Sequence, residues 1–127
     1  MTTKVSYGVA NIADINQHTW ALSGDVVAET LPCMFVLTGN TAGYNEVVEF
    51  SRYCAKITGG TSVDVKFQKN GVDIPNSSAT ITTTKQTVSS FTANTMINED
   101  ELTVVTSSPS GSPVNLSVTA FFIRKSE

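Results

Sequence analysis

The chain has 127 residues and a formal net charge of −3, with 15% charged and 40% hydrophobic residues. This length suits a single domain, and a negative charge without a basic stripe argues against a nucleic-acid partner. No apolar run approaches the roughly 20 residues that cross a bilayer, so no membrane partner is expected.

β-Branched residues dominate the composition. Threonine occurs 18 times and valine 15 times, against 5 leucines, and this favours pleated strands over helices. Turn residues recur at the spacing of about 8–12 residues that is typical of sandwiches. We therefore predict an all-β fold, an antiparallel β-sandwich or jelly roll of about seven or eight short strands.

Residues 1–43 are predicted to be an irregular N-terminal segment with short strands, and residues 44–127 the β-sandwich core of the same domain. The start of the chain lacks the layout of a signal peptide, so we expect synthesis in a cytoplasm without export by the general route. Three apolar residues of this segment, Val5, Val9 and Ile12, are candidates for contact with a partner, which would make the segment an attachment arm.

The single tryptophan, Trp20, has two interpretations. It anchors the core, or it fills an apolar pocket on a partner subunit.

A long strand is predicted from Glu46 to Ile57, with Tyr53, Ala55 and Ile57 on one face. The clearest element is the hairpin that follows. Residues 63–68 alternate apolar and polar side chains, the period of a strand with one dry face. Asn70-Gly71 then tolerates the positive φ angles of a type I′ turn.

On the return strand of this hairpin, Val72 and Ile74 are predicted to resume the alternation. Ala79–Val88, rich in threonine, is predicted to be one strand, and residues 89–98 a connection. Ser107–Pro113 contains two prolines and a glycine among small polar residues and is predicted to be a loop.

The last strand carries two apolar sets. Leu116, Val118, Ala120 and Phe122 are expected to face the core, whereas Phe121 and Ile123 fall on the opposite face. Exposed apolar residues of this kind mark an interface. Phe121 and Ile123 are therefore predicted either to contact another subunit or to be covered by the N-terminal segment.

Catalytic motifs are missing from the sequence. His18 is the only histidine and has no nucleophile motif near it. Asp64 and Asp73 could approach each other across the hairpin, as a glycosidase pair would, but charge pairing with neighbouring lysines explains them without chemistry. We predict that the protein is not an enzyme and has no catalytic residue and no cofactor.

No metal site is expected either. Cys33 and Cys54 are predicted to be reduced, partly buried thiols, with a structural disulfide as the alternative. These cysteines and His18 do not form a zinc ligand cluster. Glu99-Asp100-Glu101 is interpreted as a solvated turn, with cation binding as its best functional alternative.

Three segments carry a resemblance to a known family: Val63–Ile74 around Lys69-Asn70-Gly71, Glu99–Val104 with its acidic turn, and Asn115–Phe122. With these, the second half of the chain resembles small β-sandwich proteins and modules of tailed-phage virions. The resemblance implies a non-enzymatic structural protein located in the virion. The form most expected is a capsid decoration or cement protein that binds the major capsid protein or other virion proteins and stabilises the assembled shell.

A homo-oligomer, with a trimer favoured, agrees with this resemblance because an oligomer covers exposed sheet edges. The alternative function is a receptor- or carbohydrate-binding module of a tail or fibre. Tyr7 and Tyr44 are then the candidates for contact with a glycan.

Overall fold

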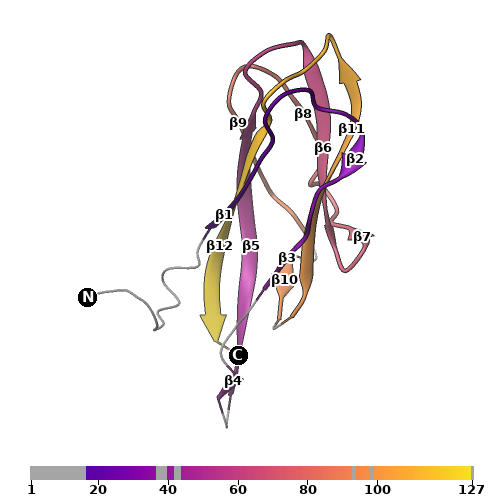
Figure 1. Ribbon diagram of the computed structural model, residues 1–127. Helices are drawn as coiled ribbons and strands as arrows, with labels where there is room; N and C mark the ends of the chain where they lie inside the picture. Colours follow the sequence, from indigo (N-terminus) through magenta and orange to yellow (C-terminus); the bar gives the residue numbers. More distant parts are fainter. Residues whose placement is uncertain (1–16, 37–39, 42–43, 93, 98, 127) are drawn as a thin grey trace, which may run out of the picture.

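The computed structural model describes residues 17–36, 40–41, 44–92, 94–97 and 99–126. Two antiparallel sheets of six strands each stand face to face, and none of the described residues is helical (Figure 1). The predicted all-β sandwich is confirmed. The described residues form twelve strands rather than the expected seven or eight, because six of these strands are only two or three residues long. Over these residues, no helix is long and apolar enough to cross a membrane.

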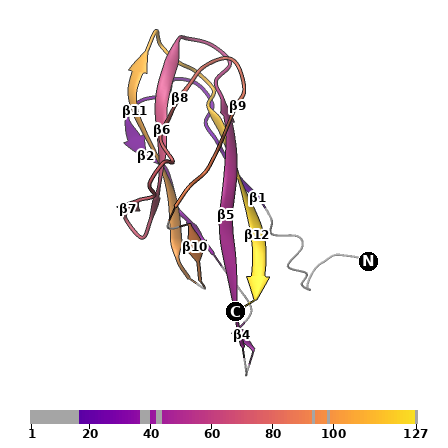
Figure 2. The same ribbon diagram turned by 180° about the vertical axis from the view of Figure 1, so that it is seen from behind.

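The first sheet is centred on the long strand β5. Its strands are β1 (Gln17–Ala21), β12 (Ser117–Ser126), β5 (Tyr44–Lys56) and β10 (Thr95–Met96), with β4 (Asn40–Thr41) and β9 (Gln86–Ser89) also paired to β5. β12 pairs with β5 and β1, whereas β9 and β10 also pair with β5 (Figure 2).

The second sheet is centred on β11 and β6. Its strands are β2 (Glu29–Thr30), β11 (Glu101–Ser110), β6 (Ser62–Lys69) and β7 (Val72–Asp73), with β3 (Met34–Phe35) on β11 and β8 (Ala79–Ile81) on β6. Strands β1, β2 and β3 all precede residue 44, so the sandwich includes part of the predicted N-terminal segment.

The central strand β5 contains one extra residue. Phe121 of β12 lies opposite Arg52, and the next residue, Phe122, lies opposite Phe50, so Ser51 has no partner and forms a β-bulge. The Ser51 hydroxyl donates a hydrogen bond to the Phe121 carbonyl at 3.2 Å. The buried face of Tyr53, Ala55 and Ile57 is as predicted. The bulge adds Phe50 to that face, although it is three residues from Tyr53.

An aromatic cluster joins the two sheets. The Phe50 ring lies 4.7 Å from that of Phe67 in β6 and 4.5 Å from that of Phe91, and Tyr53 lies 4.7 Å from Phe67. The Tyr53 hydroxyl, deep in this cluster, donates a hydrogen bond to the Ser77 carbonyl at 2.7 Å. Each buried aromatic ring contributes about 1.5–3 kcal/mol of transfer free energy, so the cluster is a principal source of stability.

Trp20 anchors the core, which was one of its two interpretations. It is 6% exposed, and its indole Nε1–H donates to the Pro32 carbonyl at 2.7 Å. Its ring meets Phe67 edge to face at 5.6 Å. Because β1 belongs to the first sheet and Pro32 lies between β2 and β3 of the second, this hydrogen bond links the two sheets along one side.

Two predicted elements were wrong in their extent. The threonine-rich segment is not one strand: β8 pairs with β6 in the second sheet and β9 pairs with β5 in the first. Between them the Thr82 hydroxyl accepts a hydrogen bond from the Thr84 amide, and such local bonds compete with the sheet ladder. The predicted loop from Ser107 is half strand, because β11 continues to Ser110.

Pro109 fits in β11 because the pairing with β6 is irregular there. The register shifts between Ser107 and Ser110, and Ser108 has a φ of 49°. Proline lacks the amide hydrogen that a regular ladder needs, and an irregularity removes that need. The sequence pattern marked the proline correctly but could not show that the strand resumes after it.

The predicted hairpin between β6 and β7 is confirmed. Asn70 and Gly71 have φ angles of 51° and 83° at its turn. The predicted alternation on the return strand is wrong, because Val72 is 69% exposed while Ile74 is buried. β7 is only two residues long, so the chain bends inward before a second strand face is established.

The side chain of Asn70 ties this turn to the acidic turn before β11. Its Nδ2 donates to the Asp100 carboxylate at 3.0 Å, and its Oδ1 accepts from the Glu101 amide at 2.8 Å. Asp100 also accepts from the Ile97 amide at 2.8 Å. The central carboxylate of the acidic turn therefore holds the two turns together through these hydrogen bonds.

We expect Asn70→Ala to lower the free energy of unfolding by about 1–3 kcal/mol, through lost hydrogen bonds and a strained positive φ. Asn70→Gly keeps the backbone freedom and loses only the amide. Urea unfolding of both variants separates the two effects. Equal stability of wild type and Asn70→Gly would show that the side-chain bonds contribute nothing.

Burial raises the pKa of the Tyr53 phenol above its usual range. The folded state therefore holds this proton more tightly than the unfolded state, and the resulting stability is present below about pH 10 and lost as the pH rises above it. We expect Tyr53→Phe to cost about 1–3 kcal/mol at neutral pH by leaving the Ser77 carbonyl unpaired. The deficit should shrink in urea titrations above about pH 10. A deficit that does not change with pH would contradict this account.

Candidate functional site

Four of the residues predicted to make contacts, Val5, Tyr7, Val9 and Ile12, lie outside the described residues. Tyr44 was expected in a loop. It is instead the first residue of β5, where its backbone pairs with Thr41 of β4.

Phe121 and Ile123 lie on the outer face of the first sheet, as predicted. Ile123 is 49% exposed. Phe121 is half-buried, because the Arg52 guanidinium lies 4.5 Å from its ring centroid. The row next to Phe121 is polar, with Thr19, Thr119, Cys54 and Thr87 side by side across four strands. The apolar part of this face is therefore small.

The two cysteines are free and lie on different parts of the sandwich. Cys54 is in β5 of the first sheet, with its Sγ 3.3 Å from the Thr87 hydroxyl, and Cys33 lies just before β3 of the second sheet. Cys33 is exposed rather than partly buried as predicted. In the part of the chain that the structure describes, no three histidine, cysteine or acidic side chains are grouped as metal ligands.

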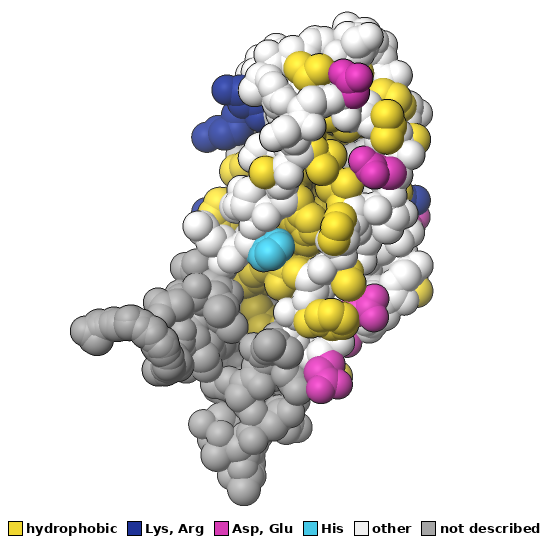
Figure 3. Space-filling model, in the orientation of Figure 1, with side chains coloured by type: hydrophobic (Ala, Val, Ile, Leu, Met, Phe, Trp, Pro, Cys, Tyr) yellow, Lys and Arg dark blue, Asp and Glu magenta, His cyan; other side chains and the backbone are white. Residues whose placement is uncertain are grey.

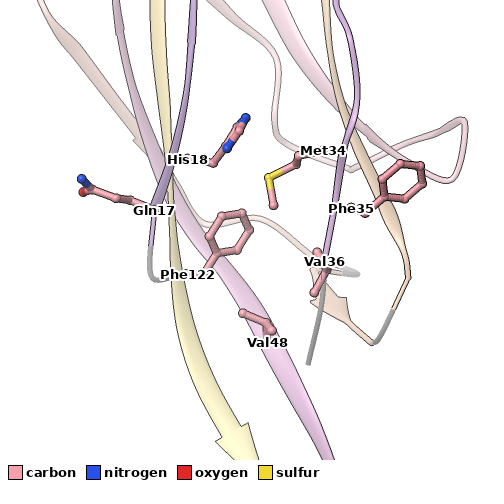
Figure 4. A pocket seen from close by; sticks show the side chains of 7 residues that line it. All are labelled: Gln17, His18, Met34, Phe35, Val36, Val48 and Phe122. Atoms are coloured by element: carbon pink, nitrogen blue, oxygen red, sulfur yellow. The ribbon is translucent and has the colours of Figure 1, made fainter. Parts of the chain in front are cut away.

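Between β1 and β3 the sandwich has an apolar hollow of about 420 Å³ (Figure 4). Met34, Val36, Val48 and Phe122 point into it, and His18 extends over it from β1. Figure 3 shows His18 beside a continuous hydrophobic strip between the two sheets. None of the described residues that line the hollow places a carboxylate or nucleophile beside His18.

The two aspartates of the hairpin do not approach each other. Asp73 lies opposite Gln68, whereas Asp64 lies opposite Thr80 and Ser107. Lys66 forms a salt bridge of 3.1 Å with Asp73, so the predicted charge pairing is present.

A polar hollow of about 470 Å³ lies on the outer face of the second sheet, over β6, β8 and β11. Strand alternation directs its side chains, because Val63, Val65 and Phe67 are buried and their neighbours Asp64 and Lys66 must point outward. The hollow is lined by Asp64, Val65, Lys66, Ser78, Ala79, Thr80, Val105 and Ser107.

Asp64 is the centre of this polar hollow. The Thr80 hydroxyl donates to its Oδ1 at 2.9 Å, which holds the carboxylate in place. In the register, Asp64 lies between Thr80 of β8 and Ser107 of β11. Val105, half-buried, provides an apolar patch in the next row beside Lys66.

The charge of Lys66 is balanced in place. The Asp73 carboxylate accepts hydrogen bonds from Gln68 at 2.9 Å and from Lys66 at 3.1 Å, and these bonds lower the pKa of Asp73. Lys66 thus has a fixed direction and a neutralising partner. Asp64 is the only carboxylate among the described residues of the lining, and it forms no salt bridge with a described residue.

This arrangement gathers a carboxylate, an ammonium group and three hydroxyls beside an apolar patch. Carboxylate oxygens only accept hydrogen bonds, the ammonium only donates, and hydroxyls do both. The set therefore suits a ligand rich in hydroxyl groups. The sequence indicated that Asp64 and Lys66 face outward, but no local pattern could show that Thr80 and Ser107 lie beside them.

No family model matches the sequence, and no curated protein matches it. Among solved structures, the chain is similar to the C-terminal domain of EclA, a sugar-binding protein, with a TM-score of 0.53 at 17% identity over 93% of this chain and 84% of that one. It is also similar to dimeric latent PorU from Porphyromonas gingivalis, with a TM-score of 0.35 at 18% identity over 84% of this chain and 13% of that one. The first similarity shows a shared fold, and the second is too distant to support an argument.

Proposed function

We propose that the protein is a carbohydrate-binding β-sandwich module and that the polar hollow around Asp64 is its binding site. The observation that carries the proposal is the oriented carboxylate of Asp64, held by Thr80 and flanked by Lys66 and Ser107 in a hollow of about 470 Å³. A volume of this size falls in the range of roughly 300–1,000 Å³ that holds small ligands.

Sugar recognition explains the chemistry of this lining. Two adjacent hydroxyls of a pyranose can donate to Asp64, while Lys66 and the serine and threonine hydroxyls bond the remaining oxygens. The C–H face of the sugar ring would pack on Val105. None of the described residues that line this hollow is aromatic, so neither glycan-contact candidate from the sequence, Tyr7 or Tyr44, is part of the lining found.

The shared fold with the sugar-binding domain of EclA supports the proposal without deciding it, because one fold serves many functions. The local charge adds a further constraint. With Lys66 paired to Asp73, the unpaired Asp64 leaves the hollow net negative, which favours neutral sugars over acidic ones.

We expect calorimetric titration against maltohexaose, cellohexaose, mannohexaose and chitohexaose to give saturable binding for at least one. Asp64→Asn should weaken that binding about tenfold or more, because hydrogen bonds to a charged group contribute about 1.5–3 kcal/mol. Asp25→Asn makes the same charge change at an exposed carboxylate outside the hollow and is the matched control. Equal losses in both variants, or none in Asp64→Asn, would contradict the site.

The virion resemblance gives a second proposal, a structural protein of a tailed-phage particle that works as a homo-oligomer. The exposure of Ile123 at 49% on the outer face of β12 favours it, because a subunit contact would bury this side chain and Phe121 beside it.

Light scattering coupled to size exclusion tests this second proposal. We expect a trimer that becomes a monomer in Ile123→Ser and stays a trimer in Val72→Ser, the control at a more exposed aliphatic residue elsewhere (69% against 49%). A monomeric wild type at micromolar concentration would contradict the subunit contact.

A further inference from the structure

The apolar hollow between β1 and β3 is a second cavity, separate from the polar hollow and on another part of the molecule. We infer that it binds a small amphiphile, whose alkyl or aromatic body enters the hollow and whose anionic or hydrogen-bond-accepting end lies at His18. The inference is independent of carbohydrate binding at Asp64.

The lining supplies the apolar half of this specificity. Met34 comes from β3 of the second sheet and Val36 directly follows that strand, whereas Val48 and Phe122 come from the first sheet, so both sides of the sandwich present apolar side chains to one space (Figure 4). Gln17 and Phe35 border the hollow but point away from it. An apolar cavity of about 150 Å³ holds benzene, and this hollow, at about 420 Å³, has room for a ring with a short alkyl chain.

The hollow lies next to the point where Trp20 bridges the two sheets. Trp20 spans the two sheets through its hydrogen bond to Pro32. Two residues earlier in β1, His18 has the same inward direction but is exposed, and it leans edge-on against Trp20 at 4.6 Å. Among the described residues, no second wide side chain bridges the sheets at His18, and the strip of apolar surface continues past it (Figure 3).

His18 supplies the polar half. Its imidazole forms no hydrogen bond with any described residue, and its only recorded ring contact is with Trp20. A neutral imidazole has one N–H donor and a charged one has two, so His18 can donate to an oxygen acceptor in either state. Among the described residues it is the one polar side chain directed into an otherwise apolar lining, the usual layout of a small-molecule site.

The probe is 4-phenylbutyrate, with 4-phenylbutylamine as the matched ligand of opposite charge. Methyl resonances of Met34, Val36 and Val48 should shift saturably in the full-length protein, and the acid should bind about tenfold more tightly than the amine. The preference is a stringent test, because the net charge of −3 favours the amine at long range. Equal affinities, or shifts at other methyl groups, would overturn the assignment.

Two variants separate the two halves of the site. His18→Phe keeps a ring against Trp20 but has no hydrogen-bond donor, so it should remove the preference for the acid while both ligands still bind. Met34→Trp should fill the hollow and abolish binding of both. Val72→Trp adds the same ring at an exposed residue and should leave binding unchanged. If Met34→Trp does not fold, the comparison of the wild type with His18→Phe still tests the inference. Shifts of these methyl groups with protein concentration alone would show that a second copy fills the hollow, and would overturn the inference.

Discussion

Where β5 pairs with β12, β5 contains one residue more than β12. This extra residue, Ser51, forms a β-bulge. A regular strand would place Phe50 and Tyr53 on opposite faces, because side chains alternate with a period of two. The bulge sends both rings to the core, where they meet Phe67 of the opposite sheet. The fixed face of β6 depends on that contact, and so does the outward direction of Asp64. A slip of one residue in β6 would bury Asp64 and expose Phe67.

The two hollows are consequences of how the sheets are joined. The aromatic cluster and Trp20 hold the sheets together, and between β1 and β3 the described residues leave an apolar hollow near His18. On the outer face of the second sheet, Asp64 of β6 lies between Thr80 of the short strand β8 and Ser107 of β11, and these side chains form a polar site. One site therefore lies between the sheets and the other on the outside of one sheet, and they have opposite chemistry.

The sequence predicted those features of the fold that depend on neighbouring residues. The all-β class, the Asn70-Gly71 turn, the buried face of β6 and the outward direction of Ile123 all follow from alternation and turn chemistry within a few residues. The division of residues 79–88 between two sheets, the bulge at Ser51 and the neighbours of Asp64 depend on pairing between distant strands. No periodicity records such pairing, so the candidate site could be predicted only as separate residues.

The central claim is that the outer face of the second sheet binds a carbohydrate. The most direct test is backbone amide NMR of the ¹⁵N-labelled protein, titrated with the neutral hexasaccharide that binds most tightly, to map where the resonances shift. The account predicts saturable shifts that cluster on β6, β8 and β11 around Asp64, Thr80 and Ser107. Saturable shifts on the first sheet, or none with any hexasaccharide, would contradict it.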